Sequence, residues 1–293
     1  MTREKEIYKV TLVGSLGNLL LLVFKFVAGV VGHSSAMIAD AVHSLSDFAT
    51  DVVVLAFVRV SAKPQDASHD YGHGKFETIA SFLIGLALVA VAIGIIVAGG
   101  LKLSAWLSGE ALDVPGVLAL WAALLSIVVK ELLYRYTARR GKALESQVMI
   151  ANAWHHRSDA LSSVAAAIGI GGAILLGERW AVLDPLASIV VGAMLVKVAW
   201  DLLKTNIDEL TEGSLPAETE EEILQLIAAT PGVEQPHHLR TRRIGNHYAI
   251  EVHVCMDGAL PLREAHDKAT MIEKGIKTRF GQQTHVTIHM EPQ

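Results

Sequence analysis

Two apolar stretches of the chain each carry a histidine followed four residues later by an aspartate. The pairs are His43 with Asp47 and His155 with Asp159. Positions four apart share one face of a helix, so each stretch would present an imidazole and a carboxylate side by side. Two neutral imidazoles and two carboxylates form a four-ligand set suited to a divalent ion of borderline softness, Zn²⁺ first. Without an ion, the same groups could hold protons or bond to neighbouring helices.

Histidine and acidic residues also gather outside the apolar stretches. A polar joint at residues 63–77 contains four of them within eight positions: Asp66, His69, Asp70 and His73. So short a run can wrap one ion, although histidines in loops are often only solvated. Near the C-terminus, His289 and Glu291 alternate onto one face of a strand, where His253 could lie beside them on a paired strand. Both clusters are candidate metal sites.

The elements that must position these groups are predicted to be membrane helices. Hydrophobic residues make up 52% of the 293 residues and charged residues only 19%, against about 25% charged in an ordinary soluble domain. Six apolar stretches are each long enough to cross a bilayer as a helix. They lie near residues 8–31, 36–60, 76–101, 115–136, 147–176 and 181–204. We expect the first of them to be a mature span and not a cleaved signal peptide.

Charge and cysteine content exclude several other classes of protein. The net charge of -5 argues against a nucleic-acid binder, for which a basic field is the usual requirement. The single cysteine, Cys255, excludes an intramolecular disulfide framework and is expected to be a core or edge thiol. No phosphate-cradling loop with Lys and Ser/Thr occurs, so the sequence does not support ATP hydrolysis.

The depth of the carboxylates in the membrane favours a functional role. Asp47 and Asp159 each lie about twelve residues from one end of their stretch, which at about 1.5 Å per residue places both near mid-membrane. Ionisable groups at that depth are costly and mark ion or proton pathways. Asp40 and Asp51 share the stripe of Asp47 but lie farther from the centre, so we expect them to line the path of the ion. His156 is rotated away from the pair and is expected to face a neighbouring helix or lipid.

The distribution of Lys and Arg predicts the orientation of the chain. Ten of them lie at residues 3–9, 59–75 and 135–142, whereas the alternate joints carry only Lys102 and Arg179. Positive residues stay on the cytoplasmic side, so both termini are expected in the cytoplasm. Three lysines inside the apolar runs are expected to extend their amines to the interface: Lys25, Lys130 and Lys197.

Beyond Asn206 the composition changes, and from Pro216 the sequence predicts a small α+β domain. Its expected elements are a helix at 217–229, strands at 237–245 and 247–256 joined by the turn pair Gly245–Asn246, a helix at 262–280 and a strand at 285–290. The predicted fold class is therefore a membrane all-α domain of six transmembrane helices at residues 1–207. A small cytoplasmic α+β domain of order αββαβ follows at residues 208–293.

Seven segments of the chain together resemble the cation diffusion facilitator family. They are ADAVHSLSDFATD, DYGHGKFET, HHRSDA, PHHLRTR, EVHV, LPLREAH and IHMEP, and the likeness spans nearly the whole chain. The resemblance implies six membrane helices and a metallochaperone-like, ferredoxin-like cytoplasmic domain. It also implies a homodimer that exports Zn²⁺ or a related divalent ion from the cytoplasm in exchange for protons.

Motif by motif, the resemblance implies three metal sites and one charged pair. The transport site would be His43, Asp47, His155 and Asp159. The loop site would be Asp66, His69 and His73. A two-ion cytoplasmic site would draw on His237, His253, His266, His289 and Glu291, with His238 as the alternative to His237. The pair that would lock dimer-related helices together is Lys75 and Asp208.

The sequence therefore predicts a proton-coupled antiporter, and not an enzyme, in a membrane such as a bacterial inner membrane. Zn²⁺ is expected both as the transported ion and as a structural or regulatory ion, with Fe²⁺, Co²⁺, Cd²⁺ or Mn²⁺ as alternatives. A membrane-anchored metal sensor or scaffold is a rival, but it has no need for costly ionisable residues at mid-membrane. An enzyme is a weaker rival, because four protein ligands would leave a zinc ion no open position for a substrate.

Overall fold

The computed structural model describes residues 3–61, 63–143, 147–245 and 247–293. The chain divides into two compact units, Met1–Val52 with Ile84–Asp201 and Val53–Leu83 with Leu202–Gln293. The first unit is helical, and the second contains a sheet together with the joint between the second and third long helices. Of the predicted turn pair, Asn246 lies outside the described residues.

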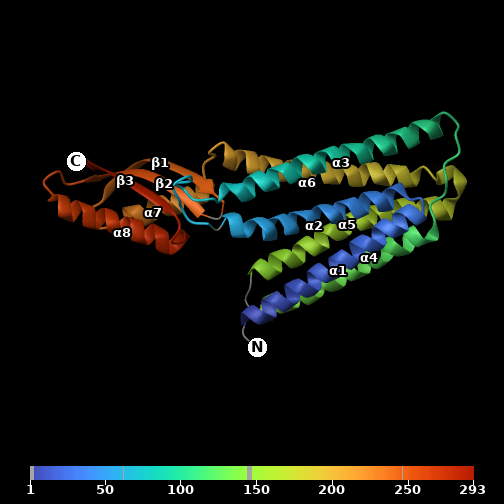
Figure 1. Ribbon diagram of the computed structural model, residues 1–293, viewed down its shortest axis with the longest axis horizontal. Helices are drawn as coiled ribbons and strands as arrows, with labels where there is room; N and C mark the ends of the chain where they lie inside the picture. Colours follow the sequence, from blue (N-terminus) through green and yellow to red (C-terminus); the bar gives the residue numbers. More distant parts are fainter. Residues whose placement is uncertain (1–2, 62, 144–146, 246) are drawn as a thin grey trace. The chain divides into compact units, whose positions relative to one another are not determined.

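Long α-helices form at all six predicted apolar stretches (Figure 1). They are α1 (Arg3–Val31), α2 (Ser35–Ser61), α3 (Lys75–Leu107), α4 (Val117–Ala143), α5 (Gln147–Leu176) and α6 (Leu183–Leu210), with a 3-10 turn, η1 (Glu178–Trp180), before α6. Within the described residues, five spans are long and apolar enough to cross a membrane, and α2 is not among them. The charges that lower the hydropathy of α2 include Asp40 and Asp47.

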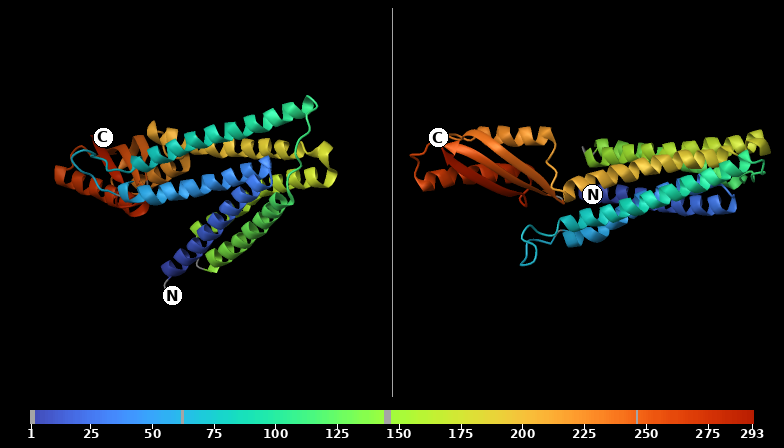
Figure 2. Two further views of the ribbon diagram at one scale, coloured as in Figure 1. Left: turned by 45° about the vertical axis from the view of Figure 1, so that its right-hand side comes forward. Right: turned by 90° about the horizontal axis from the view of Figure 1, so that it is seen from above.

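Small residues allow the helices of the first unit to approach closely. α1, α4 and α5 lie side by side (Figures 1 and 2), and their contacts involve buried alanines such as Ala28, Ala122 and Ala166. Lipid gives helices no hydrophobic reason to associate, so close van der Waals contact between small side chains and hydrogen bonds between helices hold them together. Large apolar side chains such as Ile168 and Leu175 are instead exposed, as a lipid-facing surface requires.

The N-terminus of α2 is fixed by a carboxylate from α6. Asp184 accepts hydrogen bonds from the Ser34 hydroxyl at 2.5 Å and from the Ser35 backbone N–H at 2.7 Å. The first N–H groups of a helix have no partner within the helix, and an acidic side chain there satisfies them and complements the helix dipole. The start of α2 is therefore held at a defined position, which sets the register of the groups farther along it.

The second unit contains a three-stranded sheet with two helices. Its elements are α7 (Ala217–Ala228), β1 (Glu234–Ile244), β2 (His247–Met256), α8 (Leu262–Phe280) and β3 (His285–Pro292), so the predicted order αββαβ is confirmed. The strand order is β1-β2-β3, with β1 antiparallel and β3 parallel to β2. Ile223, Val252 and Ile272 belong to the core between the helices and one face of the sheet. Alternate residues of β2 and β3, including His253 and His289, lie on the other face.

Candidate metal centre

Three of the four predicted transport residues converge between α2 and α5. Ligand atoms of His43, Asp47 and Asp159 all lie within 4.8 Å of one another. His43 is 5% exposed and Asp159 is 4% exposed. His43 Nδ1 and Asp47 Oδ2 are buried and have no hydrogen-bond partner among the described residues. Buried polar atoms without partners are costly, and a divalent cation bound among these donors would satisfy them.

The fourth predicted residue, His155, lies at the edge of this group. Its Nδ1 is 3.6 Å from Asp159 Oδ1, yet its side chain is 56% exposed. Among the described ligand atoms it is not part of the set that converges within 4.8 Å. The helical spacing of four residues therefore brings His155 next to Asp159, as predicted, without pointing its ring at His43 and Asp47.

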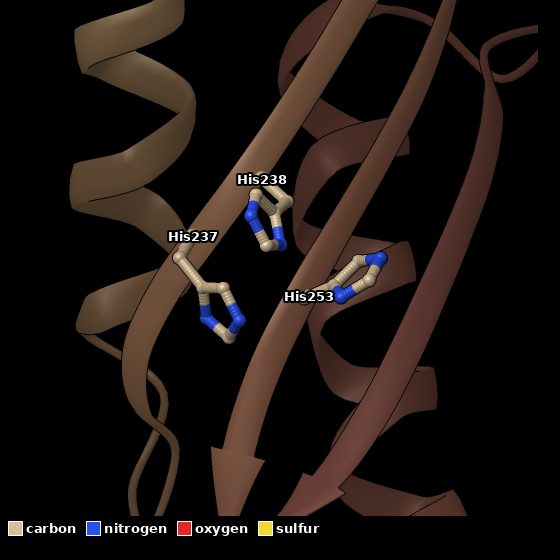
Figure 3. Close-up of side chains that lie close together, drawn as sticks. All are labelled: His237, His238 and His253. Atoms are coloured by element: carbon tan, nitrogen blue, oxygen red, sulfur yellow. The ribbon is translucent and has the colours of Figure 1, made fainter.

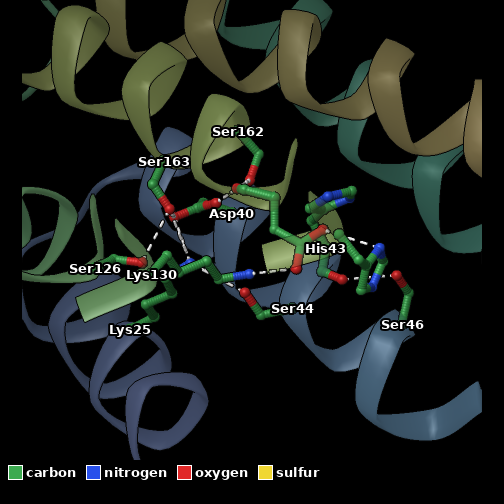
Figure 4. Close-up of polar contacts among 11 residues, drawn as sticks. Lys25, Asp40, His43, Ser44, Ser46, Ser126, Lys130, Ser162 and Ser163 are labelled. Carbon is green, nitrogen blue, oxygen red and sulfur yellow. Dashed lines mark hydrogen bonds and ion pairs between the residues drawn. The ribbon is translucent and has the colours of Figure 1, made fainter. Parts of the chain in front are cut away.

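Two lysines from other helices occupy the same buried region. Lys25 Nζ of α1 is 2.8 Å from Asp40 Oδ2 (Figure 4). Lys130 Nζ of α4 is 2.8 Å from Asp159 Oδ2. The prediction that these two lysines extend to the interface is wrong, because each finds a carboxylate at its own depth. Lys197 on α6, by contrast, is exposed.

Asp40 is a structural anchor, and the prediction that it lines the ion's path is wrong. Its side chain is fully buried and accepts hydrogen bonds from the hydroxyls of Ser162 at 2.7 Å and Ser163 at 2.8 Å, in addition to its ion pair (Figure 4). Both of its oxygens are therefore occupied. The side chain of Asp51, with which it was grouped, lies outside the described residues. His156 is buried beside Gly14 of α1, so it faces a neighbouring helix as expected.

The predicted loop residues also converge. Ligand atoms of Asp66, His69 and His73 lie within 4.8 Å of one another, and the two imidazole rings have centroids 4.3 Å apart. Hydrogen bonds from the Ser68 hydroxyl and backbone N–H lower the pKa of Asp66 to about 2, so this carboxylate is ionised at neutral pH. Asp70 is exposed and does not belong to the convergent set of the described residues.

In the sheet of the second unit, Glu291 lies between two sets of ligand atoms. Its Oε1 is 3.0 Å from His253 Nδ1 and 3.6 Å from His289 Nε2. Its Oε2 is 3.3 Å from His237 Nε2, and a ligand atom of Cys255 converges with those of His237 and Glu291. A hydrogen bond with His253 and the neighbouring imidazoles hold the pKa of Glu291 below its ordinary value. One carboxylate with a different set on each oxygen is an arrangement that could bridge two ions.

A β-bulge places both His237 and His238 next to His253. Successive residues of a regular strand point to opposite faces, so only one of the two should face the cluster. The pairing of β1 with β2 shifts register on both sides of His237, and His238 has φ +47°. The rings of His237 and His238 are consequently 5.5 and 5.1 Å from that of His253 (Figure 3). Residue types alone gave no signal of this bulge.

The remaining predicted residues lie apart from these sets. His266 is exposed on α8 and is absent from the convergent groups found among the described residues. Lys75 forms an ion pair with Glu212 in the same chain. Asp208, the expected counterpart of Lys75 across a dimer, is exposed.

Comparison with known proteins accounts for nearly the whole chain. The pattern of the cation efflux transmembrane domain matches residues 11–211, and that of the cation efflux protein cytoplasmic domain matches residues 215–293. The manganese efflux system protein MneP of Bacillus subtilis (strain 168) is 36% identical over 99% of this chain and 97% of its own length. An uncharacterised transporter of Methanocaldococcus jannaschii is 38% identical over 94% of both chains. Metal tolerance protein C1 of Arabidopsis thaliana is 37% identical over 98% of this chain and 62% of its own length.

These matches agree with the helical membrane domain and the small sheet domain described above. The chain therefore belongs to the cation diffusion facilitator family of metal efflux transporters, and it is an integral, multi-pass membrane protein.

Proposed function

We propose that the chain is a proton-coupled exporter of Zn²⁺ whose transport site is His43, Asp47, His155 and Asp159. The observation that carries this proposal is the buried convergence of His43, Asp47 and Asp159, two of them with polar atoms that lack a partner among the described residues. A change of rotamer would bring the exposed ring of His155 from the edge of the site into a tetrahedral set.

Proton exchange follows from the chemistry of these ligands. Imidazole and carboxylate bind a metal ion in their deprotonated forms, so ion binding from the cytoplasm would release protons. On the opposite side of the membrane, protonation of the same groups would compete with the ion and promote its release. An inward proton gradient would then drive export through two states of different access.

Mn²⁺ is the second candidate ion, because a relative that is 36% identical is named as a manganese efflux protein. Mn²⁺ favours more oxygen ligands and a higher coordination number than Zn²⁺. Asp40, the further α2 carboxylate whose side chain the structure describes, has both oxygens engaged by Lys25, Ser162 and Ser163. Two imidazoles and the lack of an available oxygen from Asp40 therefore favour Zn²⁺.

The other clusters would deliver metal ions to the transport site and stabilise the homodimer. Asp66, His69 and His73 would hold an ion transiently on the cytoplasmic side, and the cluster around Glu291 would bind structural or regulatory ions in a homodimer. Lys75 and Asp208 would lock dimer-related helices. We propose a transport domain at residues 1–207, a cytoplasmic domain at 208–293, cytoplasmic termini and a bacterial inner membrane as the location.

Flux measurements in proteoliposomes test the transport site. Asp47→Ala and Asp159→Ala should each reduce Zn²⁺-dependent proton flux to the level of empty liposomes, because each removes an anionic ligand. Asp113→Ala changes an exposed carboxylate between α3 and α4 and should retain flux. Wild-type flux in both ligand variants, with folded protein recovered, would refute the assignment.

Competition between metals separates the two candidate ions. Under one proton gradient, transported Zn²⁺ and Mn²⁺ can be counted with both ions supplied at equal concentration. We expect Zn²⁺ to be preferred by the wild-type chain, and His43→Asp to shift the ratio toward Mn²⁺ because it replaces a nitrogen ligand by oxygen. Preference for Mn²⁺ in the wild type would favour the second candidate.

A further inference from the structure

Lys130 is a buried cation beside the proposed transport site. Its Nζ donates a hydrogen bond to Asp159 Oδ2 at 2.8 Å, and the two side chains are only 3% and 5% exposed. Asp159 is at the same time one of the three residues whose ligand atoms converge. The ammonium group of Lys130 on α4 therefore already contacts a carboxylate that the transported ion would use.

Lys25, the second buried lysine of this region, has more hydrogen-bond acceptors than Lys130. Lys25 Nζ contacts Asp40 Oδ2 at 2.8 Å and the hydroxyls of Ser44 and Ser163 at 3.0 Å each, so its three N–H groups all have acceptors. Lys130 Nζ has one hydrogen-bonded acceptor within the part of the chain that the structure describes, the carboxylate of Asp159. Among the described residues Lys130 has this single acceptor and Lys25 has three, so fewer hydrogen bonds must break when the ammonium of Lys130 moves off its partner.

We propose that Lys130 is a tethered counter-ion that occupies Asp159 when the transport site is empty and is displaced when the metal ion binds. With neutral imidazoles, Asp47 and Asp159 give the ligand set a charge of -2, and Lys130 reduces it to -1. A concentrated negative charge is unfavourable in a buried site of low dielectric, so the lysine stabilises the empty state. This inference rests on the proposed function, because it takes Asp159 to be a metal ligand.

The consequence is that Lys130 weakens metal binding. A divalent ion must replace the contact between Lys130 and Asp159 and then remain near the buried positive charge of Lys130. A transport site must bind its ion firmly enough to capture it and weakly enough to release it. Lys130 would thus promote release by returning to Asp159 as the ion leaves, and it would act as a positioning residue and not as a ligand.

Equilibrium binding of Zn²⁺ to the purified full-length protein tests this role. Lys130→Gln keeps a donor for Asp159 but removes the charge, so the Kd of the membrane site should fall on the order of tenfold, the scale on which groups behind a metal ligand change affinity. Transport by the same variant should show a lower KM together with a lower kcat, because release becomes slower. Lys130→Met should behave in the same way, and Lys130→Arg, which retains the charge, should keep the wild-type Kd.

A merely structural role for Lys130 predicts the opposite sign, because a damaged site binds its ion less tightly. Unchanged or weaker Zn²⁺ binding in folded Lys130→Gln and Lys130→Met would therefore overturn the inference. Asp47→Ala in the same assay identifies the membrane site by the loss of one ion per chain. If Asp47→Ala loses no ion, the proposed function fails. If it loses the ion but the Lys130 variants do not bind more tightly, only the present inference fails.

Discussion

At the scale of single residues, Lys25 and Asp40 are two buried charges that each require the other. Both side chains are fully buried, and they connect α1 with α2. The hydroxyls of Ser162 and Ser163 extend the network to α5. Removing one partner from such a pair leaves an uncompensated charge in a region of low dielectric, which costs about 3–5 kcal/mol. The network therefore holds α2 and α5 together next to the pairs that would carry the ion.

Removal of either charge should lower the stability of the full-length protein. We expect Lys25→Met and Asp40→Leu to reduce the free energy of unfolding by about 3–5 kcal/mol each, and the double variant to recover most of that loss because no buried charge is left alone. Thermal unfolding in detergent, followed by circular dichroism, measures both effects. Lys197→Met is the matched control, since that lysine is exposed on α6. Additive losses in the double variant would contradict this account.

The sequence predicted the convergence of His43, Asp47 and Asp159 better than it predicted the partners of the buried lysines. The spacing of His43 with Asp47 and of His155 with Asp159 is a local property of one helix, so it could be recognised directly. The partner of Lys130 lies on a different helix, 29 residues along the chain. Periodicity within one helix carries no information about which other helix approaches at the same depth, so the sequence alone favours an interfacial position for these lysines.

At the scale of elements, glycines determine how closely neighbouring helices can approach. A Cβ atom at Gly169 of α5 would lie 2.8 Å from the Leu183 carbonyl oxygen and closer still to Ala187 Cβ, both on α6. A Cβ at Gly171, on the same helix, would have its nearest neighbour, Leu120 Cδ1, at 3.5 Å, an ordinary van der Waals distance. Gly169 is therefore required for the contact between α5 and α6, whereas Gly171 has room for a methyl group.

Replacing each of these two glycines by alanine should distinguish the effect of helix–helix packing on stability from the effect of helix propensity. Gly169→Ala must push α5 and α6 apart and should destabilise the protein by about 1–3 kcal/mol, the usual cost of overpacking. Gly171→Ala should be neutral or stabilising, because alanine favours the helix by about 1 kcal/mol relative to glycine. Thermal unfolding of the two variants under identical detergent conditions compares them. Equal stabilities would show that the close approach at Gly169 does not matter.

At this scale, the ends of helices and the irregularities of strands could not be predicted from the sequence. The stretch 147–176 coincides with α5, but α6 continues to Leu210 although the apolar stretch ends near residue 204. A helix can continue beyond the membrane with polar residues, so hydropathy alone does not find its end. The bulge at His237 was not predicted either, because its backbone conformation depends on pairing with β2.

At the scale of the whole molecule, the two compact units do not follow the ends of the helices. The C-terminal part of α2, the N-terminal part of α3 and the end of α6 belong to the same unit as the sheet. In that unit, the joint between α2 and α3 contacts β3. Gln65 Nε2 lies 3.2 Å from His285 Nε2, and the ring of Tyr71 lies 5.1 Å from that of His285. His247 of β2 completes this contact region, with its ring 5.6 Å from that of His285.

This contact should weaken on mild acidification. Burial lowers the pKa of both His247 and His285, and the pKa of His285 is lowered further by the neighbouring His247, Lys277 and Arg242. For His247, a hydrogen bond with the Tyr71 backbone and the charge of Glu209 oppose the effect of burial without reversing it. A histidine whose pKa is lower in the folded state takes up more protons when the contact opens. The contact is therefore stable above the ordinary histidine pKa of about 6.5 and is lost progressively as the pH falls below it.

Hydrogen exchange of residues 63–74, corrected for the intrinsic effect of pH on exchange, measures this opening. Between about pH 7.5 and about pH 5.5, a range that brackets the ordinary histidine pKa, exchange in this joint should increase in the wild-type protein. His285→Gln retains a polar side chain near Gln65 but cannot take up a proton, so its exchange should depend much less on pH. His266→Gln, which changes an exposed histidine of α8, should respond as the wild type does. If His285→Gln opened with acid as readily as the wild type, protonation of the His285 imidazole would not control the contact with β3.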